Sequence, residues 1–595
     1  MAKKFIDIMD TSFRDGFQSV FGGRVLMDDF FPALEAAKEA GITHFEFGGG
    51  ARFQSLFFYL QENAFEMMDR FREIVGPEAN LQTLARGVNT VMLDTGSREL
   101  VDLHAKMFKK HGTTTIRNFD ALNDVKNLQY SGERIAHHGI NHEAVVTMMD
   151  LPPGCTGAHD VAFYEKTLRE ILDAGIPYSS ICFKDASGTS SPQKVYETIK
   201  MAKKLLPEGT HVRLHTHETA GVSVACYLAA LEGGADGIDL AASPLSGGTS
   251  QPDLLTMLHA VKGKDFDLGG LDIEKVLVYE EVVQDCLKDY FMPPEATQVS
   301  PLIPFSPMPG GALTANTQMM RDNNILNRYP EVIKAMREVV EKGGYGTSVT
   351  PVSQFYWQQA FSNVMQGTWK KIAPSYGRMV LGYFGKTPVA PDPEIVKIAS
   401  EQLELEPTTE SAIDIADRDE KKTIAYWKGV LEKENIETTE ENIFIAASCD
   451  QKGIAFLKGE SPLMVRKKGL EEETKKESSM GSGNYTVVVD GQKFSVQVAE
   501  GDANIEVKAC EPAAAAAPAS SGEAGTEEIK AGVPGNVWKI LKNPGDKVEA
   551  DETILILEAM KMEIDVKATK AGTISTINVN TNEKVTEGHV LATLS

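Results

Sequence analysis

The stretch DDFFPALEAAKEAGITHFEF, residues 28–47, joins an amphipathic helix pattern to a strand pattern. The predicted helix, Asp28–Ala40, opens with acidic residues, which suit the positive end of the helix dipole, and it stops at Gly41. A strand candidate, Phe5–Asp10, precedes this helix, and another, Thr43–Phe47, follows it. Strand, helix and strand in this order form the unit from which parallel sheets are built.

The same alternation continues to about residue 260, with a second clear helix at Phe163–Ala174 that Gly175 ends. The later strand candidates are Asn80–Leu84, Thr113–Arg117, Ala144–Met149, Ser179–Phe183, His211–Thr216 and Asp236–Ala241. Eight strands, each followed by a helix over roughly 250 residues, predict an α/β fold of the (β/α)8 TIM barrel type. A doubly wound sheet is the alternative, because alternation alone does not close a ring, but its G-x-G-x-x-G fingerprint after the first strand is missing.

The composition excludes several classes of protein. The chain has 595 residues, 42% of them hydrophobic, and a net charge of −24, which disfavours binding to nucleic acid or to anionic lipid. Its 6 cysteines lie far apart without paired spacing, which is typical of a reducing compartment and argues against a thiolate zinc site. No apolar run approaches ~18 residues, so we expect a soluble, cytoplasmic protein.

The C-terminal half predicts further domains. The barrel is expected at 1–300 and a mostly helical region at 301–470, where the strand alternation is lost. A charged linker at 471–483 leads to a small β segment at 484–510, in which Tyr485–Val498 reads as a hairpin turned at Asp490-Gly491. An Ala/Pro linker at 511–525 cannot bury a core and predicts a tether to a last domain at 526–595.

That last domain contains an internal repeat. GNVWKI at 535–540 matches GTISTI at 572–577, and NPGDKV at 543–548 matches NTNEKV at 580–585, with a constant offset of 572 − 535 = 37. Two copies of a short β unit predict a small all-β domain with pseudo-twofold symmetry, a flattened barrel or sandwich. The motif EAMKM at 558–562 falls between the copies, which predicts Lys561 at the tip of a hairpin.

Polar residues gather at the predicted carboxyl ends of the barrel strands, where such barrels hold their active sites. His215 and His217, two apart at the end of a strand, share one side, and with the carboxylate of Asp15 they could bind a divalent metal. A pair of polar loop histidines is the alternative. Lys184 ends a largely apolar strand, so it either pairs with an acid such as Asp185 or takes part in chemistry.

The repeat domain resembles the biotin carboxyl carrier domain of biotin-dependent enzymes. The lipoyl domain shares that fold but usually lacks methionine on both sides of its lysine, whereas Met560 and Met562 flank Lys561 here. The resemblance implies covalent biotin on Lys561, attached by a biotin protein ligase. A cofactor on a tethered domain keeps a high effective concentration at distant sites.

The rest of the chain, residues 1 to about 465, resembles the carboxyltransferase domain of pyruvate carboxylases and the α subunits of oxaloacetate decarboxylases. Seven motifs match in order: Asp10–Gln18, Phe45–Ala51, Ala85–Asn89, Phe119–Asp124, Phe183–Gly188, Leu214–Thr219 and Met308–Gly311. The resemblance implies a zinc, manganese or cobalt ion held by Asp15, His215, His217 and a carbamylated Lys184. It places Arg86 on the carboxylate of the keto acid, Arg14 and Gln18 near its carbonyl, and Thr314 as the proton shuttle.

Three positions depart from the family pattern: Phe17 replaces the usual His, Gly48 a common Trp and Arg52 a common Thr. The change at Phe17 puts an acid–base or orienting role of that position in doubt, whereas the metal ligands are intact.

The expected function is therefore the carboxyltransferase and biotin-carrier subunit of a two-subunit pyruvate carboxylase, which moves CO2 from carboxybiotin to the pyruvate enolate and forms oxaloacetate. The expected partners are a separate ATP-dependent biotin carboxylase subunit and further copies of this chain. The alternative is the α subunit of a sodium-pumping oxaloacetate decarboxylase, which runs the same half-reaction in reverse beside membrane subunits. A non-catalytic carrier and a metal-dependent lyase or aldolase are two further classes; the intact ligand set argues against the first and the biotin domain against the second.

Overall fold

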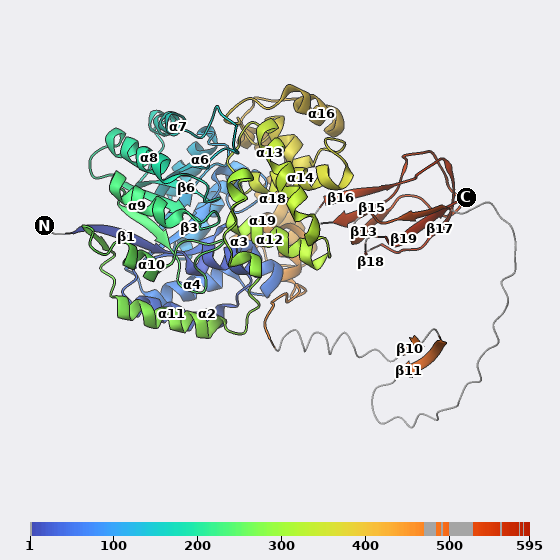
Figure 1. Ribbon diagram of the computed structural model, residues 1–595, viewed down its shortest axis with the longest axis horizontal. Helices are drawn as coiled ribbons and strands as arrows, with labels where there is room; N and C mark the ends of the chain where they lie inside the picture. Colours follow the sequence, from blue (N-terminus) through green and yellow to red (C-terminus); the bar gives the residue numbers. More distant parts are fainter. Residues whose placement is uncertain are drawn as a thin grey trace. The chain divides into compact units, whose positions relative to one another are not determined.

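The computed structural model describes residues 3–468, 483–489, 492–498 and 527–595, apart from 533, 560, 561, 582 and 587. The chain divides into two compact units (Figure 1). The first extends to Met464 without Asp289–Phe291, and the second contains those three residues and most of the described residues from Val465 onward. Within the described residues, no helix is long and apolar enough to span a membrane.

The first unit contains a closed barrel. Its strands follow the order β2-β3-β4-β5-β6-β7-β8-β1, and the pairing of β1 with β2 closes the ring, with every pair parallel. The strands are β1 Lys4–Asp10, β2 His44–Gly49, β3 Asn80–Ala85, β4 Thr115–Asn118, β5 Asn141–Thr147, β6 Ser180–Asp185, β7 His211–Thr216 and β8 Gly237–Leu240. The predicted TIM barrel is confirmed, and the doubly wound alternative is excluded. A short strand, β9 (Phe266–Leu268), extends the sheet beside the start of β1.

Helices between the strands cover the barrel. They are α2 Met27–Glu39, α4 Ala64–Val75, α5 Arg98–Lys110, α6 Lys126–His137, α7 Val161–Asp173, α8 Pro192–Leu205, α9 Ser223–Gly233, α10 Leu254–Ala260 and α11 Ile273–Leu287. The helix predicted at Asp28–Ala40 is α2, and the one predicted at Phe163–Ala174 is α7, which begins two residues earlier because the Asp160 side chain accepts a hydrogen bond from the Phe163 amide.

Short helical segments follow the first two strands at their carboxyl ends. The π-helix η1 (Ser12–Gly16) and α1 (Phe17–Phe21) follow β1, and α3 (Gly50–Ser55) and η2 (Leu56–Leu60) follow β2. A 3-10 turn, η3 (Gly87–Asn89), follows β3. Arg14 and Asp15 of η1, Gln18 of α1 and Arg86, which precedes η3, are thereby brought to the same end of the barrel.

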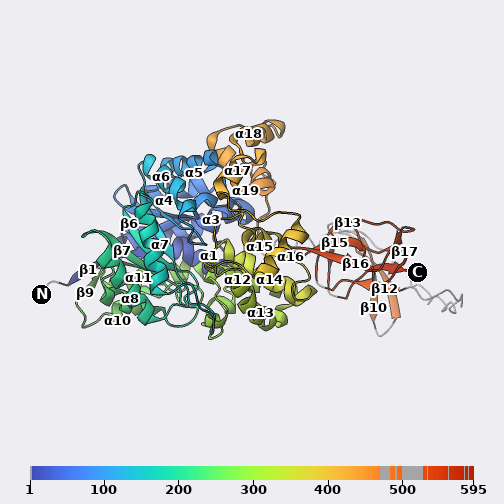
Figure 2. The same cartoon turned by 90° about the horizontal axis from the view of Figure 1, so that it is seen from above.

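The region after the barrel is mostly helical, as predicted. Its helices are α12 Gly310–Asp322, α13 Tyr329–Lys342, α14 Val352–Gln366, α15 Pro374–Val380, α16 Pro393–Leu403, α17 Ala412–Asp417, α18 Ile424–Lys433 and α19 Glu440–Leu457. Figures 1 and 2 show α12–α16 gathered at one side of the barrel. Helix α12 packs against α1, so this region contributes to the same mouth as η1.

The domain at the C-terminus consists of two four-stranded sheets, β12-β19-β17-β14 and β16-β15-β13-β18. Its strands are β12 Glu527–Lys530, β13 Gly535–Ile540, β14 Lys547–Val548, β15 Thr553–Ala559, β16 Met562–Lys567, β17 Gly572–Ile577, β18 Lys584–Val585 and β19 Val590–Leu594. The first four strands of this domain, β12–β15, correspond in order to the last four, β16–β19. Replacing each strand by its counterpart turns the order of one sheet into that of the other, which confirms the predicted pseudo-twofold symmetry. Ile554 and Leu591, equivalent positions of the repeat, are both fully buried.

Several predictions fall on residues without a described structure. Met560 and Lys561 lie outside the described residues, as do the linker at 511–525 and the predicted turn Asp490-Gly491; Met562 begins β16. Strands β10 (Gly483–Val489) and β11 (Gln492–Val498) pair antiparallel, with Val487 opposite Phe494, as the hairpin prediction requires. Gly483, expected at the end of the first linker, is the first residue of β10.

Candidate functional site

Three predicted metal ligands lie together at the carboxyl end of the barrel. Asp15 comes from η1, His215 from the end of β7, and His217 from just beyond it. Oδ2 of Asp15 lies 3.3 Å from Nε2 of His215 and 3.4 Å from Nε2 of His217, and the two Nε2 atoms are 3.1 Å apart. All three side chains are buried. A period of two along the strand places both imidazoles on one side, as expected.

Hydrogen bonds to the far nitrogens indicate which tautomers these histidines adopt. Nδ1 of His217 lies 2.8 Å from the backbone oxygen of Thr249, which can only accept, so this nitrogen carries the proton. Nδ1 of His215 lies 2.7 Å from Oδ2 of Asp239, a carboxylate, with the same consequence. Both Nε2 atoms therefore direct lone pairs toward the Asp15 carboxylate. Three electron-pair donors around one point, at this spacing, fit a divalent cation.

The Lys184 amine is the fourth predicted ligand and lies at the same place. It is on β6, 2% exposed, with Nζ 3.8 Å from Oδ2 of Asp15. Burial lowers the pKa of Lys184, and nearby Arg117 and Arg14 add to this against the raising effect of Asp15. Asp185, the other candidate partner, instead accepts hydrogen bonds from the backbone of the loop that follows β6, so the amine faces the metal ligands.

Electrostatics around Asp15 favour its ionised form. Burial raises the pKa of Asp15, but the charge of Arg14 and the neighbouring His217 and His215 together outweigh it, and the pKa lies well below its usual value. Arg14, 1% exposed, donates to Glu46 on β2 and lies 3.2 Å from Asp15. Gln18 accepts a hydrogen bond of 3.3 Å from Nη1 of Arg14. Two carboxylates therefore neutralise Arg14, so this guanidinium is already paired.

Arg86 differs from Arg14 in having no anionic partner. It follows β3 and is 3% exposed, and its Nη1 donates to the backbone oxygens of Val91 (2.6 Å) and Met92 (3.2 Å). In the described part of the chain no carboxylate pairs with it, and its buried Nε has no hydrogen-bond partner. Burial, with a contribution from Arg14, lowers the pKa of Arg86 to about 9. Such a group is suited to bind the carboxylate of a ligand.

One cavity connects these groups. It is lined by Arg14, Asp15, Gln18, Leu84, Arg86, Phe119, Lys184, Ala186, His217, Pro309, Gly311, Ala312, Val349 and Thr350. The lining joins a metal-ligand cluster, an unpaired guanidinium and apolar walls in one small space. Thr314, the predicted proton shuttle, is buried on α12 and does not line this cavity; its hydroxyl donates to Oγ1 of Thr249 at 3.2 Å.

Two of the departures from the family pattern contact each other outside the cavity. The Phe17 ring packs against Phe13 and Phe30, with centroids 6.0 and 5.1 Å away, and is 1% exposed. The Arg52 guanidinium lies 5.3 Å from the Phe17 ring centroid. Phe17 therefore has a packing role. Gly48 lies on β2 and does not line the cavity either.

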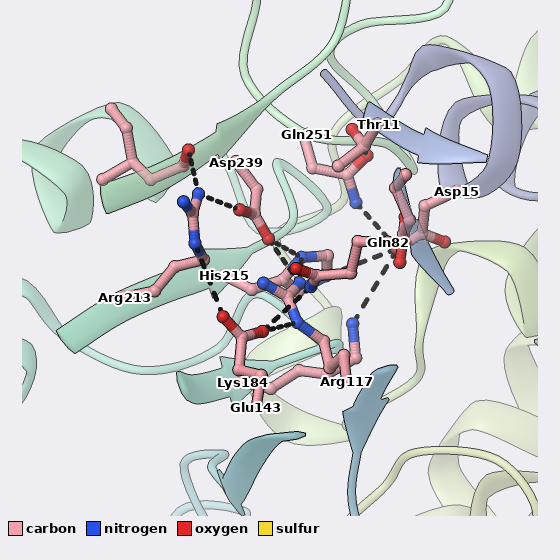
Figure 3. A network of polar contacts seen from close by, with 12 residues as sticks. Thr11, Asp15, Gln82, Arg117, Glu143, Lys184, Arg213, His215, Asp239 and Gln251 are labelled. Atoms are coloured by element: carbon pink, nitrogen blue, oxygen red, sulfur yellow. Dashed lines mark hydrogen bonds and ion pairs between the residues drawn. The ribbon is translucent and has the colours of Figure 1, made fainter. Parts of the chain in front are cut away.

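Sequence reasoning missed the polar residues behind the ligands. Arg117, Arg213, Glu143 and Asp239 form buried ion pairs inside the barrel, and Gln251 donates to Oδ2 of Asp15 at 3.1 Å (Figure 3). A signal was present, because Arg117, Arg213 and Asp239 are charged residues inside strand candidates, each next to an apolar residue. Charges there must pair with one another once the barrel closes.

Comparison with known proteins extends this description. Family models match as "HMGL-like" over residues 120–283, "Conserved carboxylase domain" over 303–506 and "Biotin-requiring enzyme" over 526–594. The chain is 30% identical to a pyruvate carboxylase subunit of Methanocaldococcus jannaschii, over 94% of both chains. The chain belongs to this family of pyruvate carboxylase subunits. It is an enzyme with carboxyltransferase activity, and its cofactors are biotin and a divalent metal ion.

The chain is also similar to subunits of other carboxyl-transferring enzymes. It is 29% identical to the methylmalonyl-CoA carboxyltransferase 5S subunit of Propionibacterium freudenreichii, over 69% of this chain and 79% of that one. It is also 28% identical to the 2-oxoglutarate carboxylase large subunit of Hydrogenobacter thermophilus, over 95% and 91%. Among solved structures, a variant carboxyl transferase domain of Rhizobium etli pyruvate carboxylase with pyruvate matches with a TM-score of 0.70 and 25% identity over 78% of both chains.

Proposed function

We propose that this chain transfers a carboxyl group between biotin and the methyl carbon of pyruvate, forming oxaloacetate, as the carboxyltransferase and carrier subunit of a two-subunit pyruvate carboxylase. The observation that carries the proposal is the unpaired, buried guanidinium of Arg86 in the same cavity as Asp15 and His217. A short oxo acid needs one cation for its carboxylate and positive charge beside its carbonyl, and this cavity offers both.

The proposed binding of the substrate follows from the charges. Arg86 would hold the carboxylate through its forked donors, which fixes the plane of the molecule. Arg14 and Gln18 would lie beside the keto oxygen, where negative charge grows as the methyl group loses a proton. Apolar walls such as Leu84, Phe119 and Val349 exclude water, so these charges act at low dielectric.

Asp15, His215, His217 and Lys184 would hold the metal ion, and Lys561 would carry the biotin. When bound, the metal ion supplies positive charge at the keto oxygen and biotin supplies the activated carboxyl group. Lys184 would join the ligand set as a carbamate: its neutral amine attacks CO2, a nitrogen–carbon bond forms, and one amine proton leaves. The lowered pKa of Lys184 favours the neutral amine that this step requires.

Thr314 would relay the proton that leaves the methyl carbon to biotin: its hydroxyl would accept this proton while giving up its own, and the exchange would run backwards in the reverse reaction. Its hydroxyl donates to Thr249 in the structure, so it must release this hydrogen bond before it can take part in the transfer. Thr249 therefore contacts both the proposed shuttle and a proposed metal ligand: its Oγ1 accepts from Thr314, and its backbone oxygen accepts from Nδ1 of His217.

The proposed setting is the cytoplasm, with a separate ATP-dependent biotin carboxylase subunit, a biotin protein ligase and further copies of this chain as partners. A second candidate is the carboxylation of 2-oxoglutarate, which the relative from Hydrogenobacter thermophilus favours. That substrate has two carboxylates, whereas Glu46 and Asp15 already neutralise Arg14, which leaves Arg86 as the unpaired guanidinium among the described residues that line the cavity. The charge count therefore favours pyruvate.

The test is reconstitution of the biotinylated chain with a biotin carboxylase subunit, ATP and bicarbonate. We expect oxaloacetate from pyruvate, with at least about a thirtyfold lower kcat/KM for 2-oxoglutarate, since an unpaired buried carboxylate costs about 2–5 kcal/mol. Equal turnover of both acids would refute the assignment of substrate. Oxaloacetate decarboxylation without any carboxylation in the reconstituted system would favour the oxaloacetate decarboxylase alternative.

A further inference from the structure

Asp239, on β8, lies directly behind one of the metal-ligand candidates without belonging to the ligand set. It is fully buried, and its Oδ2 lies 2.7 Å from Nδ1 of His215. Its other oxygen, Oδ1, accepts a hydrogen bond of 2.8 Å from Nη1 of Arg213. Nη1 of Arg117 also donates to Oδ2, so one carboxylate joins an imidazole to two guanidinium groups (Figure 3).

The tautomer of His215 depends on this carboxylate. Nη1 of Arg117 lies 3.2 Å from Nδ1 of His215 as well, and a guanidinium can only donate. Asp239 and Arg117 therefore favour opposite states of Nδ1: the carboxylate accepts a hydrogen bond from a protonated Nδ1, whereas the guanidinium donates to an unprotonated one. The shorter contact to the carboxylate places a proton on Nδ1 and leaves the lone pair on Nε2, which faces Asp15 and His217. Without Asp239, Arg117 would donate to Nδ1, and the proton would move to Nε2.

We propose that Asp239 is a positioning residue of the metal centre: it fixes the tautomer and the ring orientation of His215, while Arg117 and Arg213 hold its carboxylate in place. The inference rests on the proposed function, because it requires that a divalent ion binds at Asp15, His215 and His217. Carboxylates that orient metal-bound histidines change metal affinity by about 10–100-fold when they are removed.

Glu143 on β5 provides a matched control. It is 2% exposed, and its carboxylate contacts the same two guanidinium groups, with Oε1 on Nε of Arg117 and Oε2 3.7 Å from Nε of Arg213. Among the described residues, no hydrogen bond joins Glu143 to His215. Glu143→Gln and Asp239→Asn therefore each remove one negative charge from the same buried pair of arginines, and Asp239→Asn alone changes the contact to the histidine.

An asparagine at position 239 would favour the tautomer of His215 that carries its proton on Nε2. Its amide has one accepting oxygen, for which the charged guanidinium groups compete more strongly than the neutral imidazole does. Its NH2 group would then face Nδ1 of His215 and donate to it, as Arg117 does.

The experiment compares the chelator-treated full-length wild type, Asp239→Asn and Glu143→Gln by isothermal titration with Mn²⁺. We expect the Mn²⁺ dissociation constant to rise about 10–100-fold in Asp239→Asn and by less than about threefold in Glu143→Gln, since Glu143 does not touch the ligand. The inference is overturned if Asp239→Asn binds within threefold of wild type, or if both variants weaken binding equally. If the wild type itself does not bind Mn²⁺, Zn²⁺ or Co²⁺, the proposed function fails and not merely the role of Asp239.

A measurement on the wild type covers the case in which Asp239→Asn does not fold. Long-range proton–nitrogen NMR of the metal-free protein labelled with ¹⁵N-histidine reports the tautomer, and a His215→Gln spectrum assigns the resonance. We expect the proton on Nδ1 of His215. A proton on Nε2 would overturn the inference.

Discussion

Replacing Arg86 by Met tests the proposed substrate site, because stability and activity should change in opposite directions. Arg86 is 3% exposed, and no carboxylate of the described chain pairs with it. Methionine fills a similar volume without charge. The variant should therefore gain stability by removing an unpaired buried charge and lose the group that recognises the carboxylate of the substrate.

The magnitude of the gain follows from the pKa of Arg86, which burial and the charge of Arg14 lower to about 9, ~3.5 below its usual value. Because the folded-state pKa lies below the unfolded one, the charge destabilises the fold by its full cost below about pH 9, and this cost decreases as the pH rises from about 9 toward the usual pKa of arginine. At ~1.4 kcal/mol per pH unit, the charge costs roughly 5 kcal/mol at neutral pH. The oxygens of Val91 and Met92 lose their donor, which offsets about 1–3 kcal/mol. A net gain on the order of 2 kcal/mol remains.

The loss of activity follows from the charge-assisted hydrogen bonds. Truncating one partner of a buried charge-assisted pair costs about 2–5 kcal/mol, which corresponds to a decrease in kcat/KM of about 30-fold to several thousandfold. Differential scanning fluorimetry with and without pyruvate, together with steady-state kinetics, measures both effects. We expect a higher Tm for metal-loaded Arg86→Met than for wild type, and no further increase with pyruvate.

Two results would refute this reasoning. A Tm below that of wild type would mean that Arg86 has a structural partner and stabilises the fold. A pyruvate-induced increase in Tm of the same size in both proteins would mean that the carboxylate binds elsewhere. Arg14→Met is the control, since Arg14 is paired with Glu46 and Asp15 and its loss should destabilise the protein.

Three further substitutions test the metal site and the carrier. His217→Ala should lose the bound metal, measured by plasma mass spectrometry, together with carboxylation and decarboxylation; unchanged turnover would remove the metal from the mechanism. Gly310→Ala should reduce metal content several-fold more than Gly311→Ala. A Cβ at Gly310 would lie 1.6 Å from the Thr249 backbone oxygen that contacts His217, whereas a Cβ at Gly311 would meet the flexible Gln18 side chain at 3.2 Å. Equal metal content in both variants would contradict this prediction. Lys561→Arg should abolish avidin binding and pyruvate carboxylation and leave slow, biotin-independent oxaloacetate decarboxylation; full carboxylation would exclude Lys561 as the biotin site.

Local patterns in the chain were sufficient to predict the architecture and to place Asp15, Lys184 and the two histidines at one end of the barrel. Alternating strand and helix patterns specify a parallel barrel, since each pattern depends only on local spacing, and a repeat with an offset of 37 specifies the two-sheet domain. The pair His215 and His217 could be read from the chain for the same reason, because a period of two fixes their common side.

The partners of these residues, in contrast, could be known only from the folded chain. The proton on Nδ1 of His215 depends on Asp239, and that of His217 on the backbone of Thr249, both contributed by other segments of the chain. Local spacing contains no information about such contacts. Likewise, Arg14 and Arg86 look equivalent in the sequence. In the folded chain Arg14 pairs with Glu46 and Asp15, whereas none of the described carboxylates pairs with Arg86. The difference between a paired and an unpaired arginine therefore arises from long-range packing, because only folding determines which charges find a partner.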